Sequence, residues 1–499
     1  MTQADTINAP TAGKTEHVDV LIVGAGISGI GSAYHLQDQA PGKSYAILEK
    51  YETFGGTWHM HTYPGVRSDS DLYTFGYRFK PWTSAPIASA EEIKKYMAEV
   101  ITENHIDKNI RYRHEITAAS WSSRDKRWTV TVTNLAKGET FQMTANFLWM
   151  CQGYYKHSQG YTPEWPGMDQ YKGRIVHPQT WPKDLDYKGK KVLVIGSGAT
   201  AATIVPAMAA DCEHVTILQR SPTYFVPGRN VNELADTLRQ LEVDEEWIHE
   251  IVRRKVLFDG QAVTDMAFEH PDMVKDVLLE GIRTLLPEGY DMKHFTPKYR
   301  PWQQRIAFVP EGDLFAGIKS GKASMVTDEI ETFTATGVRT KDGTVIDADI
   351  IVTATGFHLS VLGDIPFELD GKPLNWADTV TYRGMMFTGV PNLAWVFGYF
   401  RASWTLRVDI MGDFITRLLK HMDAKGVHSV TPQLRPEDAN MPIGAWMDPD
   451  NFNPNYLMRS QHLMPKSGDK QEWKHDQNYT LEKNVLPTVN FEDGCLVFE

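Results

Sequence analysis

The chain has 499 residues, more than one hydrophobic core can organise, so two or three domains are expected. Hydrophobic residues make up 42% of it and include 14 Trp and 21 Phe, which allows extensive burial. Its formal net charge of −12 argues against nucleic acid or an anionic membrane as the main partner.

The N-terminal segment, residues 1–16, is polar and lacks the apolar core of a signal peptide, so we expect a loose tail. No stretch approaches the roughly 18 uncharged apolar residues that an integral membrane segment needs. Cys151, Cys212 and Cys495 are far apart and odd in number, a pattern that fits neither a disulfide framework nor a zinc site. We therefore expect a cytoplasmic protein.

A glycine-rich turn follows the first apolar run, Val18–Val23. The next apolar run ends at Glu49, whose carboxylate suits a free ribose 2′-hydroxyl. A strand, a glycine turn, a helix and an acidic strand end about 20 residues later form the context of a dinucleotide-binding fingerprint. The first unit therefore predicts an FAD site, and the turn residues expected to bind it are Gly24, Gly26, Ser28 and Gly29.

Further elements complete a first domain expected over residues 17–155. An apolar stripe at helical spacing indicates a helix over 89–104. Alternating residues indicate strands over 121–132 and 141–149. A stretch rich in Gly, Pro and Trp, residues 156–189, is typical of a linker.

A second glycine-rich turn follows the run Lys191–Ile195. Here the next apolar run ends in Gln219 and Arg220, and the guanidinium suits a 2′-phosphate, so this unit predicts an NADPH site. The residues expected to bind NADPH are Gly196, Ser197, Gly198, Ala199, Thr200, Ala201, Arg220 and Ser221. A chain that binds both FAD and NADPH moves electrons between them.

The second domain is expected over residues 190–348, with a helical insertion at about 231–290. The run Asp349–Gly356 predicts a buried strand that returns the chain to the first domain, which residues 349–499 complete. The predicted fold class is α/β, with two Rossmann-like domains and the NADPH domain inserted in the FAD domain. Two crossings between the domains favour hinge motion.

Three motifs resemble those of a known family. Residues 171–182, Y-x-G-x3-H-x3-W-P, are similar to the fingerprint of Baeyer–Villiger monooxygenases, in which Phe stands at the place of Tyr171. Residues 55–69, G-G-x-W-x4-Y-P-G-x3-D, match its second signature, and D-x4-A-T-G at 349–356 resembles an element shared by flavin monooxygenases. The match covers nearly the whole chain, and segments such as Arg67–Asp71 resemble the ethionamide-activating subgroup.

The resemblance implies a flavin that NADPH reduces and that captures O2 as a C4a-peroxide, which converts ketones to esters or lactones and oxidises sulfur in thioethers or thioamides. Arg305 aligns with the active-site arginine, Asp69 with its carboxylate partner, and His177 with a residue that couples domain rotation to the flavin site. Gln304 replaces the usual lysine. The expected cofactor contacts extend to Gly56, Thr57, Trp58, Arg67, Ser68, Asp69 and Ile116. The expected partners are O2 and a small ketone or sulfur compound.

Three other functions fit parts of these patterns. A flavin disulfide reductase needs a C-x4-C pair after the first unit, and residues 55–63 contain no cysteine. A flavin monooxygenase that hydroxylates nitrogen or sulfur shares the D-x4-A-T-G element but lacks the other two signatures. A non-catalytic redox sensor or NADPH-binding scaffold remains open on pattern alone. His59 and His61 have a metal-like spacing, but no further ligand completes a site, so no metal is expected.

Overall fold

The computed structural model describes residues 15–499. Strand β1 (Glu16–Val23) runs parallel to β2 (Tyr45–Glu49) and β6 (Glu139–Met150), its two neighbours in a nine-stranded sheet. Helix α1 (Ile27–Gln39) connects β1 to β2. Glu16 was expected in the tail but is the first residue of β1, where it pairs with Met143. The remainder of the expected tail, 1–14, lies outside the described residues.

Part of this sheet is a meander in which β4 (His114–Ser122), β5 (Arg127–Asn134) and β6 pair antiparallel. The single strand predicted over 121–132 was wrong, because a turn closed by Ser122 and Asp125 separates β4 from β5. Apolar and polar residues alternate on both sides of this short polar turn, so the sequence pattern did not reveal that the strand is interrupted there. The helix predicted over 89–104 is α4 (Ala90–Glu103), which begins with a capping box.

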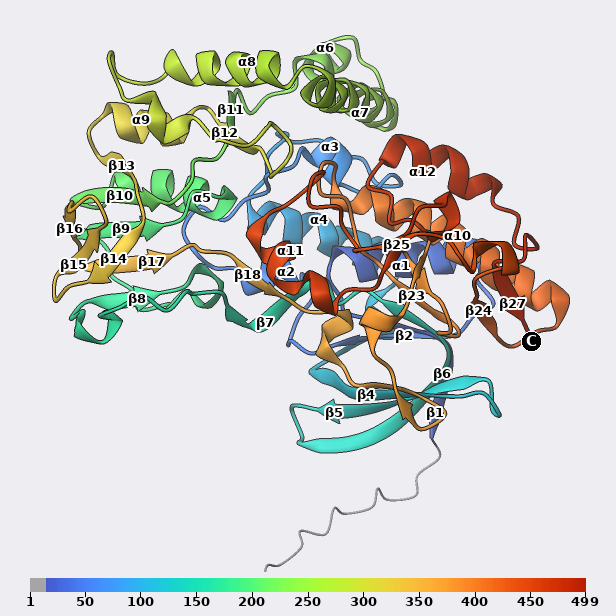
Figure 1. Ribbon diagram of the computed structural model, residues 1–499. Helices are drawn as coiled ribbons and strands as arrows, with labels where there is room; N and C mark the ends of the chain where they lie inside the picture. The colour runs from blue at the N-terminus through green and yellow to red at the C-terminus, as the bar shows by residue number, and fades with distance from the viewer. Residues whose placement is uncertain (1–14) are drawn as a thin grey trace, which may run out of the picture.

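The second sheet has five parallel strands in the order β13 (Ala323–Thr327), β10 (His214–Gln219), β9 (Lys191–Ile195), β17 (Ile350–Thr353) and β8 (Arg174–Val176). Helix α5 (Ala199–Ala209) follows β9, and α9 (Asp313–Lys319) packs beside it. The two sheets and their helices confirm the predicted α/β class with Rossmann-like domains (Figure 1).

The crossings between the two sheets differ from the prediction. Strand β17 was expected in the first domain but pairs with β9, and β8 lies inside the predicted linker. A four-residue apolar run indicates a strand without specifying its partner, and the open edge of β9 accepts it. The chain returns only after Gly356, where β18 (Phe357–Leu359) pairs with β7 (Tyr155–Gly160) in a two-stranded ribbon.

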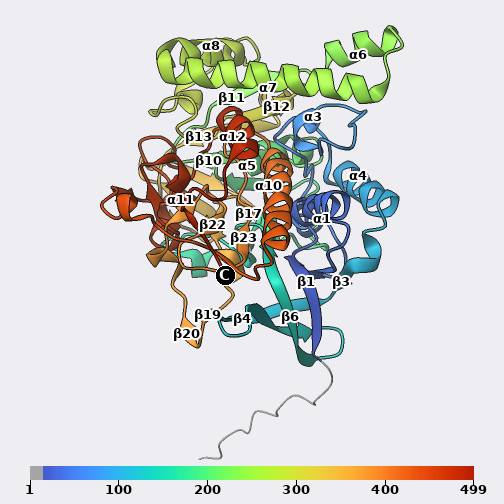
Figure 2. The same cartoon turned by 90° about the vertical axis from the view of Figure 1, so that its right-hand side faces the viewer.

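The helical insertion lies between β11 (Phe225–Gly228) and β12 (Ala307–Pro310). It consists of α6 (Glu233–Gln240), α7 (Glu245–Glu269) and α8 (Pro271–Arg283), in the stretch predicted to be helical. Figure 2 shows α7 and α8 lying across the top of the molecule, above α10 (Trp404–Lys425) and α1.

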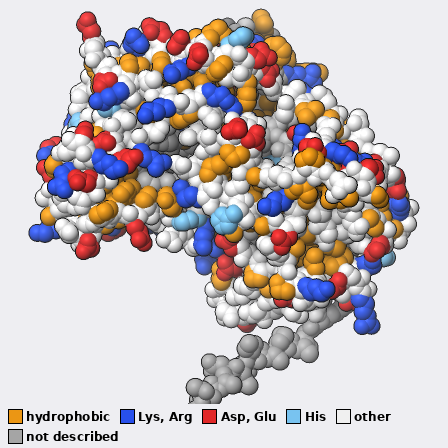
Figure 3. Space-filling view, viewed as in Figure 1, with side chains coloured by type: hydrophobic (Ala, Val, Ile, Leu, Met, Phe, Trp, Pro, Cys, Tyr) orange, Lys and Arg blue, Asp and Glu red, His pale blue; other side chains and the backbone are white. Residues whose placement is uncertain are grey.

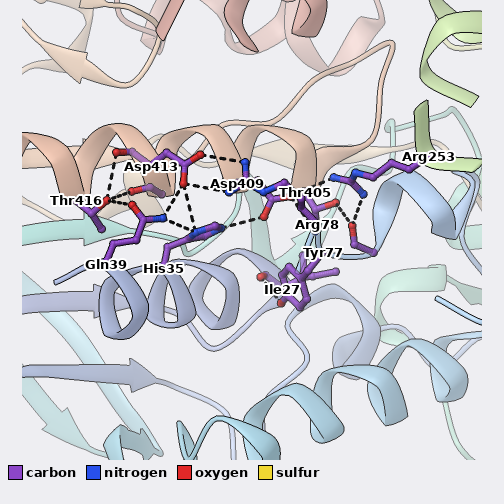
Figure 4. A network of polar contacts seen from close by, with 12 residues as sticks. Ile27, His35, Gln39, Tyr77, Arg78, Arg253, Thr405, Asp409, Asp413 and Thr416 are labelled. Carbon is purple, nitrogen blue, oxygen red and sulfur yellow. Dashed lines mark hydrogen bonds and ion pairs between the residues drawn. The ribbon is translucent and has the colours of Figure 1, made fainter. Parts of the chain in front are cut away.

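A buried ion pair fixes this insertion to the first domain (Figure 4). Arg253 of α7 lies 3.1 Å from the carboxylate of Asp409 on α10, and both side chains are at most 5% exposed. Arg253 also donates to the backbone carbonyls of Tyr73, Thr74 and Gly76. Because the guanidinium is paired with one carboxylate and three carbonyls, its burial is compensated, and α7 is held against the first domain although it belongs by sequence to the second.

No helix in the described part of the chain is long and apolar enough to cross a membrane. The face shown in Figure 3 carries acidic and basic side chains interspersed, rather than the continuous basic surface typical of nucleic-acid binding. The remaining elements are α2 (Thr57–Met60), α3 (Leu72–Phe75), α11 (Asn455–Ser460), α12 (Tyr479–Val485), β3 (Ile110–Tyr112), β14 (Ile330–Phe333), β15 (Gly337–Thr340), β16 (Val345–Asp347), β19 (Phe367–Leu369), β20 (Lys372–Pro373), β21 (Thr381–Tyr382), β22 (Met386–Phe387), β23 (Leu393–Trp395), β24 (Val430–Pro432), β25 (Ile443–Gly444), β26 (Ser467–Gly468) and β27 (Leu496–Phe498).

Candidate functional site

A cavity of about 1660 Å³ lies between the two sheets. Both glycine-rich turns line it, as do the β7–β18 ribbon and the loop that carries Arg305. Its volume exceeds the roughly 300–1,000 Å³ of an ordinary small-molecule pocket. The cavity therefore has room for two dinucleotide-sized ligands to meet.

The first glycine-rich turn brings backbone, rather than side chains, to the cavity. Gly24 has a φ of +99°, and a Cβ there would lie 2.9 Å from the carbonyl oxygen of Cys151. Gly26 and Ser28 line the cavity, whereas Gly29 packs so closely that a Cβ would lie 1.9 Å from the oxygen of Gly24. No described side chain caps α1, so its first backbone N–H groups are available to an anion such as a pyrophosphate.

Glu49 lines the cavity at the end of β2 and is only 5% exposed. One carboxylate oxygen accepts a hydrogen bond from the backbone N–H of Ala25 at 2.8 Å, and the other accepts from that of Tyr51 at 2.9 Å. Burial raises the pKa of Glu49, against the lowering effect of these bonds. Each oxygen keeps a further lone pair, so the carboxylate fits a ribose diol.

Most of the other expected flavin contacts also reach the cavity. Gly56, Thr57, Trp58, Arg67 and Ile116 all line it. Ser68 does not face the cavity as expected, because its hydroxyl accepts a hydrogen bond from the backbone of Ala88 at 3.3 Å. Successive side chains of this loop point in alternate directions, so the neighbours of Ser68 face the cavity and Ser68 does not.

Two buried polar groups at this cavity were missed as cofactor ligands from the sequence. Nε2 of His61 and the side-chain amide of Gln152 are buried and have no hydrogen-bond partner among residues 15–499, and both residues line the cavity. Buried polar groups are usually paired, so these atoms fit the polar edge of a bound heteroaromatic such as flavin. The only signal in the sequence for this role was the position of Gln152 after an apolar strand and of His61 after a glycine-rich loop. Within the described chain, no group of three His, Cys, Asp or Glu could hold a metal ion.

The second glycine-rich turn has the same construction. Gly196 has a φ of +130°, and a Cβ there would lie 2.2 Å from the carbonyl oxygen of Ala354. A Cβ on Gly198 would stand in open space on the cavity side. Ser197, Ala199 and Thr200 line the cavity, whereas Ala201, in the first turn of α5, is 1% exposed and packs in the core of the second domain.

Arg220 is exposed at the rim of the cavity, and Ser221 lies beside it. Lys341 lines the same rim and pairs with Glu329 at 2.5 Å. The hydrogen bond from Lys341 is the main cause that lowers the pKa of Glu329, and the charge of Arg220 contributes. A phosphate at this rim would meet two cations, of which the sequence indicated only Arg220.

Arg305 and Asp69 form an ion pair in the cavity wall. Nη1 of Arg305 lies 3.3 Å from Oδ2 of Asp69, and the side chains are 39% and 32% exposed. The carboxylate raises the pKa of Arg305, so the guanidinium stays charged. Both residues also line a second cavity of about 440 Å³, which α7 and the loop before α12 enclose. The pair thus stands where the two cavities adjoin.

Aromatic side chains complete the wall near Arg305. Trp404 donates a hydrogen bond from Nε1 to the hydroxyl of Ser28 at 2.7 Å and stacks on Tyr154, with ring centroids 5.0 Å apart. Tyr154, Tyr155 and Tyr456 all line the cavity. The sequence analysis missed the three tyrosines, and the only available signal was the aromatic pair that follows β6.

His177 lies outside the cavity lining, at the crossing between the domains. Its Nε2 donates to the carbonyl oxygen of Gly356 at 3.1 Å, and its Nδ1 accepts from the backbone N–H of Gln179 at 3.1 Å. Burial lowers its pKa, which keeps the ring neutral. The ring packs so closely on the β7 end of the ribbon that a Cβ at Gly160 would lie 2.0 Å from it.

Arg67 makes a second connection between the domains. Its guanidinium donates to both carboxylate oxygens of Asp313 at the start of α9, at 2.6 and 3.3 Å. The loop that carries Asp69 is therefore tied to the domain that carries the second turn.

Known proteins share this arrangement. The sequence model of the flavin-binding monooxygenase-like family matches residues 82–234, and that of the NAD(P)-binding Rossmann-like domain matches residues 22–84. The chain is 46% identical to the FAD-containing monooxygenase EthA of Mycolicibacterium smegmatis over 487 residues, 97% of each protein. It is 43% identical to the probable FAD-binding monooxygenase AlmA of Acinetobacter baylyi, over 97% of this chain and 96% of that protein.

Solved structures share the fold. The complex of OTEMO with FAD and NADP aligns with a TM-score of 0.75 at 21% identity, over 97% of this chain and 100% of that one. Oxidized steroid monooxygenase bound to NADP aligns with a TM-score of 0.73 at 22% identity, over 97% and 99%.

Proposed function

The chain belongs to the FAD-containing monooxygenases, and on that basis we propose that it is a Baeyer–Villiger enzyme that uses NADPH and O2 to insert one oxygen atom beside a ketone carbonyl. The other oxygen atom leaves as water, and NADPH provides the two electrons. We further propose that the same site oxidises sulfur in thioethers or thioamides, because the chain is similar along its length to EthA.

The Arg305–Asp69 pair is the observation that carries this proposal. Oxygen insertion needs a cation that stays charged and stabilises negative charge at the reacting atoms. Arg305 has this property because a guanidinium is charged at any ordinary pH and Asp69 raises its pKa further, and it faces the cavity that both glycine-rich turns line. A guanidinium also offers a planar fork of donors that an ammonium group lacks.

The chain's own residues fit the two cofactors. Bound FAD and NADPH supply the electron transfer and the activation of O2. Glu49 would hold the adenosine ribose of FAD, and the N-terminus of α1 its pyrophosphate. Arg220 and Lys341 would hold the 2′-phosphate of NADPH. The orphaned Gln152 amide and His61 Nε2 would bind the polar edge of the flavin.

His177 is proposed to couple the two domains rather than to transfer a proton. It contacts Gly356, where the chain crosses from the second sheet to the first, and it lies outside the cavity lining. A neutral imidazole that donates from Nε2 and accepts at Nδ1 is suited to hold this crossing in one geometry. Its loss would disturb the conformational step more than nucleotide affinity.

Product analysis tests the proposed reaction. The purified protein would be supplied with NADPH, ¹⁸O2 and a panel of linear, cyclic and aryl ketones. We expect esters or lactones that carry one ¹⁸O atom, with NADPH consumed in proportion to product. NADPH oxidation that yields only hydrogen peroxide with every ketone, together with oxidation of amines or thioethers, would overturn this proposal in favour of the heteroatom-hydroxylating alternative.

A further inference from the structure

Three tyrosines face the same part of the large cavity from separate elements. Tyr154 precedes β7 and Tyr155 is its first residue, whereas Tyr456 lies in the first turn of α11. The ring centroid of Tyr456 lies 5.8 Å from that of Tyr155 and 6.5 Å from that of Tyr154. The three phenols thus form a compact cluster beside Arg305.

The hydrogen bonds of the cluster leave one hydroxyl without a partner. The hydroxyl of Tyr154 donates to that of Tyr155 at 2.8 Å. Tyr154 is itself fixed by its stacking on Trp404. The hydroxyl of Tyr456 is buried next to those of Tyr154 and Tyr155, yet it makes no hydrogen bond of normal length and angle with any group in residues 15–499. Buried hydroxyls are nearly always paired, so an unpaired one in the lining of a ligand cavity indicates an atom of a ligand.

The charge state of the cluster suits hydrogen-bond donation. Burial raises the pKa of Tyr154, Tyr155 and Tyr456, and the positive charge of Arg305 only partly opposes this. The phenols therefore stay protonated around neutral pH. Tyr155 already accepts from Tyr154, so its own proton is directed elsewhere, and the proton of Tyr456 remains available to a ligand acceptor.

We propose that Tyr456, supported by Tyr155, donates a hydrogen bond to the carbonyl oxygen of the ketone substrate beside Arg305. This inference rests on the proposed function. As an oxygen atom adds to the carbonyl carbon, the carbonyl oxygen gains negative charge, and a donor already in place stabilises that charge more than it stabilises the ground state. Tyr456 keeps its proton throughout. A thioether has no such oxygen, so its oxidation does not need this hydroxyl.

The test compares Tyr456→Phe with Tyr382→Phe. Tyr382 also has a buried hydroxyl without a partner in the described chain, but its ring packs on Trp473, outside both cavities. For Tyr456→Phe we expect kcat with ketones to fall about 100-fold, the scale of one lost oxyanion donor. Flavin reduction by NADPH and thioether oxidation should change less than twofold. Tyr382→Phe should match the wild type in all three measurements.

A spectroscopic measurement reports the same hydrogen bond without turnover. A ¹³C-carbonyl ketone bound to the oxidised holoenzyme should show a lowered C=O stretching frequency in infrared difference spectra of the wild type and of Tyr382→Phe. The frequency should rise toward its value in an apolar solvent in Tyr456→Phe.

Two results would overturn the inference. The first is a Tyr456→Phe enzyme that makes ester at the wild-type rate with an unchanged C=O frequency. The second is an equal loss with ketones and thioethers accompanied by a raised KM for NADPH, which would assign the hydroxyl to the dinucleotide. Failure of the proposed function is distinguishable from both, because the wild type would then form no ester at all.

Discussion

Nη1 of Arg305 lies 3.3 Å from Oδ2 of Asp69, and the two residues together separate a cavity of about 1660 Å³ from one of about 440 Å³. The larger cavity contains both glycine-rich turns, and the smaller is closed by α7. The guanidinium is therefore open both to the larger cavity, which Tyr456 also lines, and to the smaller cavity beside α7.

Arg305→Ala should separate oxygen insertion from cofactor binding. We expect a yellow protein in which NADPH still reduces the flavin but which forms no ester or lactone. The reason is that the cation acts when charge develops on the reacting atoms. Arg305→Lys should recover little, since an ammonium lacks the planar fork. Arg254→Ala is the control, because Arg254 is exposed on α7 and pairs with Glu250 outside both cavity linings. Ester formation by Arg305→Ala near the wild-type rate would contradict the assignment.

Arg220→Ala should weaken the preference for NADPH over NADH. The loss of a charge-assisted contact to the 2′-phosphate should cost about 2 kcal/mol, roughly 30-fold in kcat/KM for NADPH. Values for NADH should barely change, since NADH has no such phosphate. Lys341→Ala should give a smaller loss, because Lys341 is already paired with Glu329. Equal use of NADPH and NADH by the wild type would refute the assignment of this rim as the binding site of the 2′-phosphate.

Glu49→Ala should release FAD while leaving the fold nearly intact. The carboxylate holds the backbone at Ala25 and Tyr51 and offers its remaining lone pairs to the ligand. We expect flavin loss on dialysis, measured by the 450 nm absorbance, with a far-UV spectrum close to that of the wild type. Glu52→Ala provides the control, because Glu52 is exposed and pairs with His59 outside the strand. Stoichiometric FAD after extensive dialysis would contradict the ribose role.

His177→Ala should uncouple NADPH consumption from product formation. Its hydrogen bond to Gly356 would be lost at the crossing between the domains, so turnover should slow and more NADPH should end as hydrogen peroxide. Dissociation constants for both nucleotides should stay within twofold. His214→Ala is the control, because that ring bonds to Ser324 at 2.7 Å within the second sheet. Unchanged coupling would reduce His177 to a packing residue.

Asp71 should make the thermal midpoint depend on pH near neutrality. Burial raises its pKa to about 6, although its carboxylate caps α3 by accepting from Tyr73 at 2.8 Å. Because the folded pKa lies above the unfolded value of about 3.9, its contribution is fully present below pH 4 and is lost as the pH rises through 6. Asp71→Asn keeps a capping oxygen, so it should flatten the midpoint between pH 4 and 7. An equally steep dependence in the variant would contradict the shift.

Local patterns in the sequence predicted the nucleotide-binding parts of the fold. The turns at Gly24 and Gly196 and the strand ends at Glu49 and Arg220 depend on neighbours within one βαβ unit, and the structure places all four at the cavity. The sheet to which β17 belongs depends on a pairing with β9 that no local pattern encodes.

The tyrosine cluster shows the same limit at the site. Tyr155 and Tyr456 are about 300 residues apart, and their contact exists only once α11 packs against β18. Ser68 shows the converse, because its neighbours Arg67 and Asp69 line the cavity while its own hydroxyl is bound by Ala88. A motif therefore identifies the loop, but the direction of each side chain depends on tertiary contacts.

The ion pair between Arg253 and Asp409 fixes α7 to the first domain, although α7 is inserted in the sequence of the second. Any rotation of the second sheet must leave α7 behind, while α8 packs on β11 and travels with the moving part. The backbone would then have to change at both connections, at His270 between α7 and α8 and in residues 229–232 between β11 and α6. The smaller cavity beside α7 would then keep its shape during such a rotation, while the part of the larger cavity that the second glycine-rich turn lines would move.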